Sequence, residues 1–188
     1  DMHYVDQNGD HRIDSKDRVA LGSAAPDFFG GFYTQFKYKG FALGAEFSYS
    51  KGNMAYNAVR NQLEGMNTLG NQSIAVLNRW SLDGQVTNMP RVQHNDPYRS
   101  TSFSERWLED ASYLRMKSVT LSYSFDKTVL NFFRSGTLYV SGENLLTATK
   151  YLGLDPEFSY SYGETSQGLD YAKMVQPKSV KFGVNLKF

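Results

Sequence analysis

The densest set of potential metal ligands lies in a polar segment near the start of the chain. Calcium takes six to eight hard oxygen atoms, and a 12-residue loop supplies them from positions 1, 3, 5, 7, 9 and 12. Those positions are held here by Asp6, Asn8, Asp10, Arg12 (through its backbone carbonyl), Asp14 and Asp17. We therefore predict a structural calcium ion, which would neutralise clustered carboxylates and stiffen an exposed loop.

Two positions of this loop depart from the common pattern. His11 stands at the sixth position, where Gly usually permits a sharp turn, and Gly9 lies two residues earlier. Asp17 replaces the usual bidentate Glu with a shorter side chain. The alternative interpretation is a solvated turn in which Asp and Asn side chains satisfy their own backbone.

Catalytic patterns are absent from the sequence. It has no cysteine, no G-x-S-x-G and no P-loop, and its histidines, at positions 3, 11 and 94, have no zinc-site spacing. Two carboxylate pairs, Glu109/Asp110 and Asp155/Glu157, are interpreted as solvated loop charges rather than a glycosidase pair. We expect no enzyme activity. The net charge of +1 argues against nucleic-acid binding.

Four aromatic residues in the predicted loops are candidate contacts for a flat substrate or for a partner protein. They are Trp80, Trp107, Tyr160 and Tyr162. Packing within the loops is the alternative.

Alternating apolar and polar residues predict the elements that position these side chains. Five strands are expected, near 31–39, 41–50, 113–125, 137–145 and 179–188. The last is the cleanest, with Phe182, Val184 and Leu186 on one face and Lys181 and Asn185 on the other. In the third strand, Arg115 and Lys117 share the parity of the apolar Val119. Either the strand leaves the apolar layer there, or a bulge shifts its phase.

The connections alternate between short and long, and the long insertions span 51–112 and 146–178. Helix-like spacing at Val59, Leu63 and Met66, and again from Ile74, predicts short helices in the first insertion. A transmembrane β-barrel has short turns on one side and long loops on the other, so this parity favours a barrel. Five strands cannot close one, so the chain would be part of a larger sheet. A secreted, soluble β-sandwich that binds carbohydrate and holds a structural calcium is the alternative, and an outer-membrane hydrolase barrel is disfavoured.

Several segments, taken in order, resemble the C-terminal part of SusC/RagA-type TonB-dependent outer-membrane transporters of Bacteroidetes. They are 4–10 with Ile13-Asp14, Pro26-Asp27-Phe28 with Gly30-Gly31-Phe32, Tyr38-Lys39-Gly40-Phe41, 109–117, 141–147, Thr149-Lys150-Tyr151, Asp155-Pro156-Glu157, and Pro177 followed by the strand that ends at Phe188. The likeness covers almost the whole chain, and only 52–105 and 158–176 look individual.

The resemblance implies an all-β fold: the last five antiparallel strands of a barrel of about 22 strands filled by an N-terminal plug. It implies import of oligosaccharides or peptides, with a SusD-like surface lipoprotein as lid and TonB as energy source. The plug and the TonB-contacting segment would lie outside this sequence. Residues 1–29 would form an extracellular loop with the calcium-type site, and residues 30–188 the barrel strands and their extracellular loops. We accordingly expect a location in the outer membrane of a Gram-negative bacterium.

Overall fold

The computed structural model describes residues 2–126, 134–158 and 166–188, which fall into two compact units. The first, here called the loop unit, comprises residues 2–24, 54–109 and 166–173. The second, the sheet unit, comprises residues 25–53, 110–126, 134–158 and 174–188. Strands dominate the described part of the chain, which has one α-helix, so the all-β expectation is confirmed.

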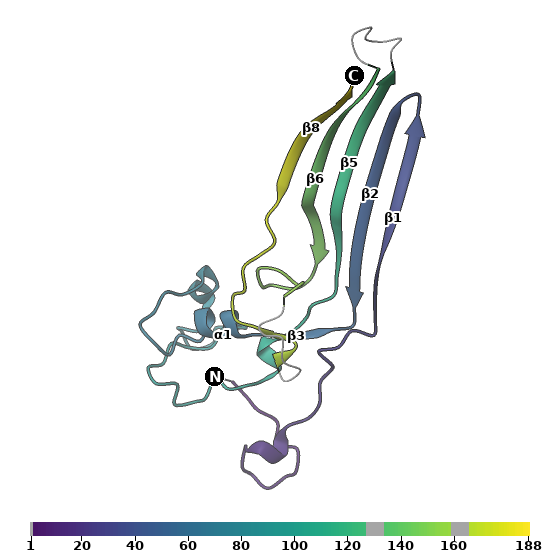
Figure 1. Cartoon of the computed structure of the whole chain (residues 1–188). Coiled ribbons are helices and arrows are strands. Elements are labelled where there is room, and N and C mark those ends of the chain that lie inside the picture. Colours follow the sequence, from purple (N-terminus) through teal and green to yellow (C-terminus); the bar gives the residue numbers. More distant parts are fainter. Residues whose placement is uncertain (1, 127–133, 159–165) are drawn as a thin grey trace. The chain divides into compact units, whose positions relative to one another are not determined.

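The sheet unit is built on one antiparallel sheet with the strand order β1-β2-β5-β6-β8 (Figure 1). Its strands are β1 (Phe28–Tyr38), β2 (Phe41–Lys51), β5 (Tyr113–Asp126), β6 (Ser135–Thr149) and β8 (Ser179–Lys187). Each observed strand overlaps one of the five predicted ranges. Each strand therefore pairs with the strand before or after it among these five, as a meander does.

A tight turn joins β1 to β2. Its central residues, Lys39 and Gly40, both have positive φ, 44° and 86°. A type I′ turn requires this at both positions, and its twist matches that of the strands it joins. The turn also sets the register, since Tyr38 lies opposite Phe41.

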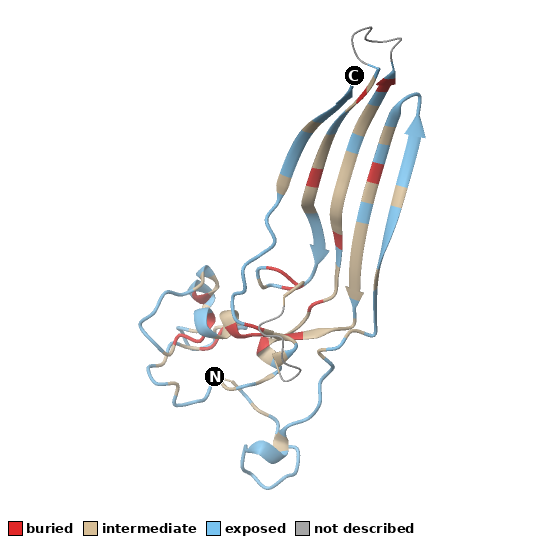
Figure 2. Ribbon diagram, in the orientation of Figure 1, coloured by how far each residue is buried: buried red, intermediate tan, exposed pale blue. Residues whose placement is uncertain are grey.

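One face of the sheet is apolar across all five strands. A single row runs from Phe36 through Leu43, Leu121 and Val140 to Phe182, each opposite the next in register. These side chains are exposed or half-buried; Phe182 is 80% exposed. Figure 2 likewise shows few buried positions along the strands. Among the described residues of the sheet unit, none therefore form a core beneath this face.

The opposite face is polar. Hydroxyl pairs join neighbouring strands, Thr120 with Ser141 at 2.9 Å and Ser124 with Thr137 at 3.1 Å. Lys181 of β8 forms an ion pair with Glu143 of β6. Apolar and polar residues thus segregate to opposite faces, as the predicted alternation requires.

A β-bulge interrupts β5 at Lys117. Glu46 of β2 lies opposite Ser118, but the next β2 residue, Phe47, lies opposite Met116, so Lys117 has no partner on β2. The same step skips Asn144 and Leu145 on β6. Of the two interpretations of the charged residues in this strand, the bulge is confirmed. Because it shifts the phase by one residue, Met116 joins the apolar face and Arg115 the polar face.

The loop unit contains short elements. They are η1 (Ser15–Asp17), β3 (Met54–Asn57), α1 (Ala58–Glu64), η2 (Ile74–Asn78), η3 (Glu105–Trp107), β4 (Leu108–Asp110, whose last residue belongs to the sheet unit) and β7 (Leu169–Asp170). Asn57 caps α1 by accepting a hydrogen bond from the backbone N–H of Arg60. The three-stranded sheet β4-β3-β7, in which β3 and β7 are parallel, was not expected.

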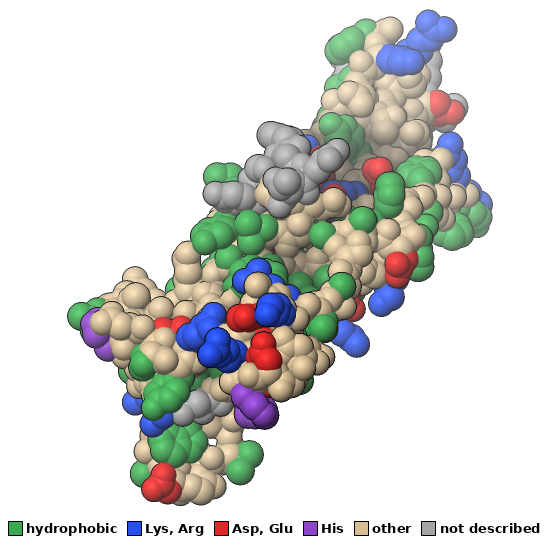
Figure 3. Space-filling model, turned by 90° about the horizontal axis from the view of Figure 1, so that it is seen from below, with side chains coloured by type: hydrophobic (Ala, Val, Ile, Leu, Met, Phe, Trp, Pro, Cys, Tyr) green, Lys and Arg blue, Asp and Glu red, His purple; other side chains and the backbone are tan. Residues whose placement is uncertain are grey.

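A small apolar cluster of Met66, Val76 and Met89 is buried in the loop unit. Other large apolar side chains stand in solvent, among them Leu69, Ile74 and Val86, and hydrophobic side chains are visible over the face shown in Figure 3. None of the helices in the described residues has the length and apolar character needed to cross a bilayer.

Candidate functional site

Arg115 is the centre of a buried ion-pair network in the sheet unit. The residue is 3% exposed, and its Nη2 donates to the Asp155 carboxylate. Its Nη1 lies 3.1 Å from Glu157 Oε2, and its Nε donates to Thr147 Oγ1 at 3.1 Å. The side chain is therefore held from three directions, and the planar guanidinium suits such convergent contacts.

Lys117, the bulged residue, completes the network. Its Nζ donates to both oxygens of Glu157, at 2.8 and 2.7 Å, and lies 3.5 Å from Gln176 Oε1. Glu157 thus receives both cations of β5. We call Arg115, Lys117, Asp155, Glu157 and Gln176 the insertion anchor.

Asp155 is the buried acid of the insertion anchor, 8% exposed. Its Oδ1 accepts the backbone N–H of Glu157 at 2.9 Å, and its Oδ2 accepts that of Gln176 at 3.3 Å. Burial raises the pKa of Asp155, but hydrogen bonds from Arg115 and from these two N–H groups outweigh it, so the pKa lies below its usual value. The carboxylate is therefore ionised at neutral pH.

The insertion anchor corrects one interpretation made from the sequence. Asp155 and Glu157 are ion-paired, and Glu109 likewise lies 2.5 Å from Arg60 Nη1 in the loop unit. Treating them as solvated loop charges was wrong. The one sequence signal near this network was the parity of Arg115 and Lys117, which predicted a bulge or an exit from the apolar layer but no ion pairs.

The acidic loop of the loop unit is closed by its first and last carboxylates. Asp6 accepts the N–H groups of Gly9 at 2.7 Å and His11 at 2.8 Å. Asp17 accepts the N–H groups of Gln7 at 2.9 Å and Asp14 at 2.7 Å. The pKa of Asp17 is lowered, chiefly by the hydrogen bond from Asp14 and then by that from Gln7.

Inside this loop, Asn8 accepts the N–H of Asp10, and Asp10 accepts that of Arg12, both at 2.9 Å. His11 has φ of 62°, so it takes the left-handed turn that Gly usually makes at this position. Within residues 2–126, 134–158 and 166–188, no group of three or more His, Asp or Glu side chains converges as a metal site. The carboxylate oxygens therefore accept hydrogen bonds from the backbone of the loop.

The candidate contact aromatics have different environments. Trp107 is fully buried, and the guanidinium groups of Arg60 and Arg106 lie 5.5 and 4.9 Å from its ring centroid. This burial supports the packing alternative for Trp107. Trp80 is half-buried, with Arg91 at 6.0 Å from its ring. Tyr160 and Tyr162 lie outside the described residues.

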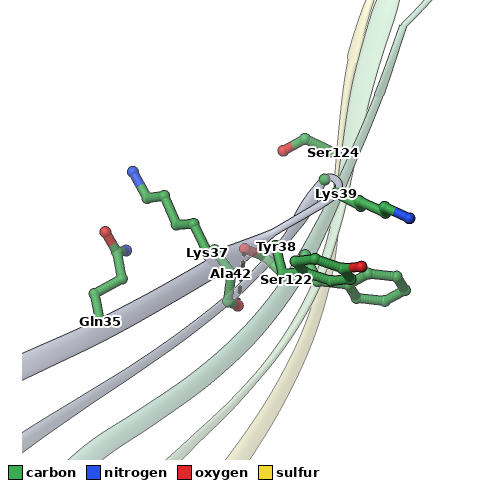
Figure 4. A pocket seen from close by; sticks show the side chains of 9 residues that line it. Gln35, Lys37, Tyr38, Lys39, Ala42, Ser122 and Ser124 are labelled. Carbon is green, nitrogen blue, oxygen red and sulfur yellow. Dashed lines mark hydrogen bonds between the residues drawn. The ribbon is translucent and has the colours of Figure 1, made fainter.

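A shallow hollow of about 470 Å³ lies at the turn between β1 and β2. Figure 4 shows Gln35 and Lys37 of β1 and Ser124 of β5 around it, with the hydrogen bond from Ser122 to the carbonyl of Ala42. None of the described residues that line this hollow is acidic.

Known proteins resemble this chain in sequence and in structure. No protein-family model matches the chain. Two proteins of Formosa agariphila, TonB-dependent receptors P3 and P26, are 32% and 30% identical to it over 98% of its length. TonB-dependent receptor SusC of Bacteroides thetaiotaomicron is 26% identical over 98% of the chain. The chain spans about a fifth of the length of these relatives, 19% for P3 and P26 and 17% for SusC.

Solved structures agree. The RagAB peptide transporter superposes with a TM-score of 0.78 at 27% identity, over 94% of this chain and 19% of that one. The RagAB peptide importer in its open-open state gives 0.77 at 28% identity, over 98% of this chain and 20% of that one.

The chain is thus a portion of a TonB-dependent receptor. Within that class it belongs to the SusC/RagA type, which confirms the resemblance read from its motifs. The relatives are named as receptors and transporters, in agreement with the expectation that the chain is not an enzyme.

Proposed function

We propose that the chain supplies five wall strands to a larger transmembrane barrel, of about 22 strands in the complete receptor, in the outer membrane of a Gram-negative bacterium. One observation carries this proposal: the apolar row from Phe36 to Phe182 is unbroken across the sheet and exposed or half-buried along its length. Lipid is the environment that such a face requires, and the polar face suits a wet lumen. The class of the relatives also supports the outer-membrane location.

A pair of substitutions on β8 in the full-length receptor tests the assignment of faces. Phe182→Arg places a charge on the apolar face and should cost about 2–4 kcal/mol near the bilayer midplane. Asn185→Arg is the matched control, because it lies on the polar face. We expect Phe182→Arg to reduce the heat-modifiable, membrane-inserted fraction while Asn185→Arg leaves it unchanged. Equal effects of the two variants would refute the assignment.

We further propose that the whole receptor imports oligosaccharides or peptides together with a SusD-like lipoprotein, and that TonB energises it through a part outside this chain. The names SusC and RagAB peptide importer among the relatives support this. Purification of the native complex, followed by identification of the co-purifying chains and ligand, tests it. Recovery of the receptor with neither a lipoprotein nor a ligand would count against it. The alternative of a soluble carbohydrate-binding sandwich is not favoured by these matches.

The two long insertions, 51–112 and 146–178, are proposed to rim the extracellular mouth, where Trp80 is a candidate contact for the lid or the substrate. Their length and aromatic content support this role. Deletion of residues 158–172 should impair lid docking or uptake, while the receptor is still incorporated into the membrane. Normal uptake by that deletion would contradict the role.

We also propose that calcium binds the acidic loop, held by oxygen atoms of Asp6, Asn8, Asp10, Asp14, Asp17 and the carbonyl of Arg12. The left-handed turn at His11 supports this, because the pattern needs such a turn at that position. The test is proteolysis of residues 2–24 in the receptor, with calcium and with a chelator. Equal cleavage rates under the two conditions would reject the ion.

A further inference from the structure

The bulge in β5 brings to the insertion two cations that a regular strand would direct to the apolar face. Arg115 lies on the polar face, and the bulged Lys117 reaches the same partner, Glu157. Since the sequence parity of Lys117 would direct it toward the apolar face, only the bulge allows both cations to serve the insertion.

Both legs of the insertion 146–178 are held at this place. The outgoing leg is tied through Asp155 and Glu157 to Arg115 and Lys117. The returning leg is tied through the backbone N–H of Gln176, which donates to Asp155, and through the carbonyl of Pro177.

Asn144 donates its Nδ2 to that carbonyl of Pro177 at 3.2 Å. Asn144 has φ of 52° and belongs to the part of β6 that the bulge skips. At this irregularity, β5 therefore contacts the outgoing leg of the insertion through Arg115 and Lys117, and β6 contacts the returning leg through Asn144.

We propose that Arg115 and Lys117 are positioning residues that clamp the base of the insertion 146–178, holding its outgoing leg at Asp155 and Glu157 beside its returning leg at Gln176. The clamp rests on contacts of described residues alone. Its importance for uptake rests, in addition, on the role proposed above for this insertion.

Arg115 and Lys117 contribute unequally to the stability of the clamp. Arg115 is 3% exposed, so its loss leaves the buried Asp155 carboxylate without its compensating charge. The Lys117–Glu157 pair is more exposed, with side chains 28% and 29% accessible, and exposed ion pairs contribute little. Arg115 is therefore the principal residue of the clamp.

The test is limited proteolysis of the insertion in the full-length receptor, in its native membrane. Arg115→Gln and Asp155→Asn should each speed cleavage at the base of the insertion, within 150–158 and 174–178, by about tenfold or more, because the local opening equilibrium governs the rate. Lys117→Gln should have a smaller effect. Lys181→Gln is the matched control, since it removes an ion pair with Glu143 on the same face without touching the insertion.

The double variant Arg115→Gln/Asp155→Asn separates a clamp from a general loss of stability. Removal of both charges leaves no uncompensated carboxylate, so cleavage should be slower than in Arg115→Gln alone. Additive effects, or cleavage in Asp155→Asn at the rate of the Lys181→Gln control, would overturn the clamp. If Arg115→Gln is not inserted in the membrane, Asp155→Asn, which lies outside the strands, still decides the question.

Uptake measured on the same variants keeps the clamp and the proposed function apart. Faster cleavage with reduced uptake supports both. Faster cleavage with normal uptake supports the clamp and contradicts the role of this insertion in transport.

Discussion

His11 carries an unusual backbone conformation for a residue with a side chain. Its φ of 62° lies in the left-handed region, which costs a residue other than Gly about 1–2 kcal/mol. His is one of the residues that tolerate this region, whereas β-branched residues do not. The loop thus accepts local strain in order to turn at its sixth position.

The effect of replacing His11 on loop closure should therefore depend on how readily the new residue adopts a positive φ, and not on the loss of the imidazole. We expect His11→Gly to keep the loop closed and His11→Val to open it, with a cost of roughly 1–2 kcal/mol. Proteolysis of residues 2–24 measures the closure. A faster rate for His11→Gly than for His11→Val would contradict the prediction.

Asp17 makes the closure of the same loop dependent on pH. Its pKa is lowered from an ordinary value of 3.8, because its ionised form accepts hydrogen bonds from Asp14 and Gln7. The contribution to stability is present above that ordinary value and is lost as the pH falls through the lowered pKa. Cleavage of the loop by pepsin should accelerate only below about pH 4.

The control for this pH effect is Asp17→Asn, which should loosen the loop at neutral pH and remove most of the pH dependence. Unchanged exchange of the Gln7 and Asp14 amides in this variant would show that Asp17 does not close the loop.

At this scale, residue types and spacing identified the acidic loop, because its contacts join residues that are near in sequence. The partners of Arg115 were not predictable in the same way. Asp155 lies 40 positions away, and their pairing depends on how a long insertion folds back, which spacing alone does not determine. The burial of Trp107 depends equally on distant neighbours.

At the scale of elements, the residues of the turn between β1 and β2 determine the register in which the two strands pair. Gly40 has φ of 86°, and a Cβ there would come within 2.7 Å of the Ser124 carbonyl oxygen. Lys39 has φ of 44°, where Asn is the favoured residue of a type I′ turn. Gly40 is thus the favoured residue at its position in the turn, whereas Lys39 is not.

Two substitutions in this turn should move stability in opposite directions. Gly40→Ala should destabilise the receptor by about 1–3 kcal/mol, and Lys39→Asn should stabilise it by a few tenths of a kcal/mol to about 1 kcal/mol. The midpoint of denaturant unfolding in detergent micelles measures both. A stabilising Gly40→Ala would show that φ of residue 40 is not positive in the receptor.

Strands were the most predictable elements, because a two-residue alternation reports directly which face each residue occupies. The short strands β3, β4 and β7 were missed, since elements of two to four residues are too short to alternate. The bulge at Lys117 was less predictable than the long strands and more predictable than the short ones. The anomalous parity of Arg115 and Lys117 marked it, yet sequence left two explanations open.

At the scale of the whole molecule, the sheet unit has three surfaces that require partners. In the part of the chain that the structure describes, no core covers the apolar face, and β1 and β8 stand at the two ends of the strand order. Unpaired edge strands and an exposed apolar face both promote association in water. Each surface has a partner if the sheet continues into a closed barrel within a bilayer.

The 188 residues expressed alone in water should therefore not yield a monomer. We expect aggregated material that dissolves only in detergent or denaturant, because the apolar face and both edges remain uncovered. Light scattering and detergent extraction measure this. The same residues within the full-length receptor should resist denaturation in detergent, since neighbouring strands of the proposed barrel would pair with both edges. A monodisperse, detergent-free monomer with a cooperative unfolding transition would mean that Phe36, Leu121 and Phe182 are covered by the chain itself, and the membrane assignment of this face would then fall.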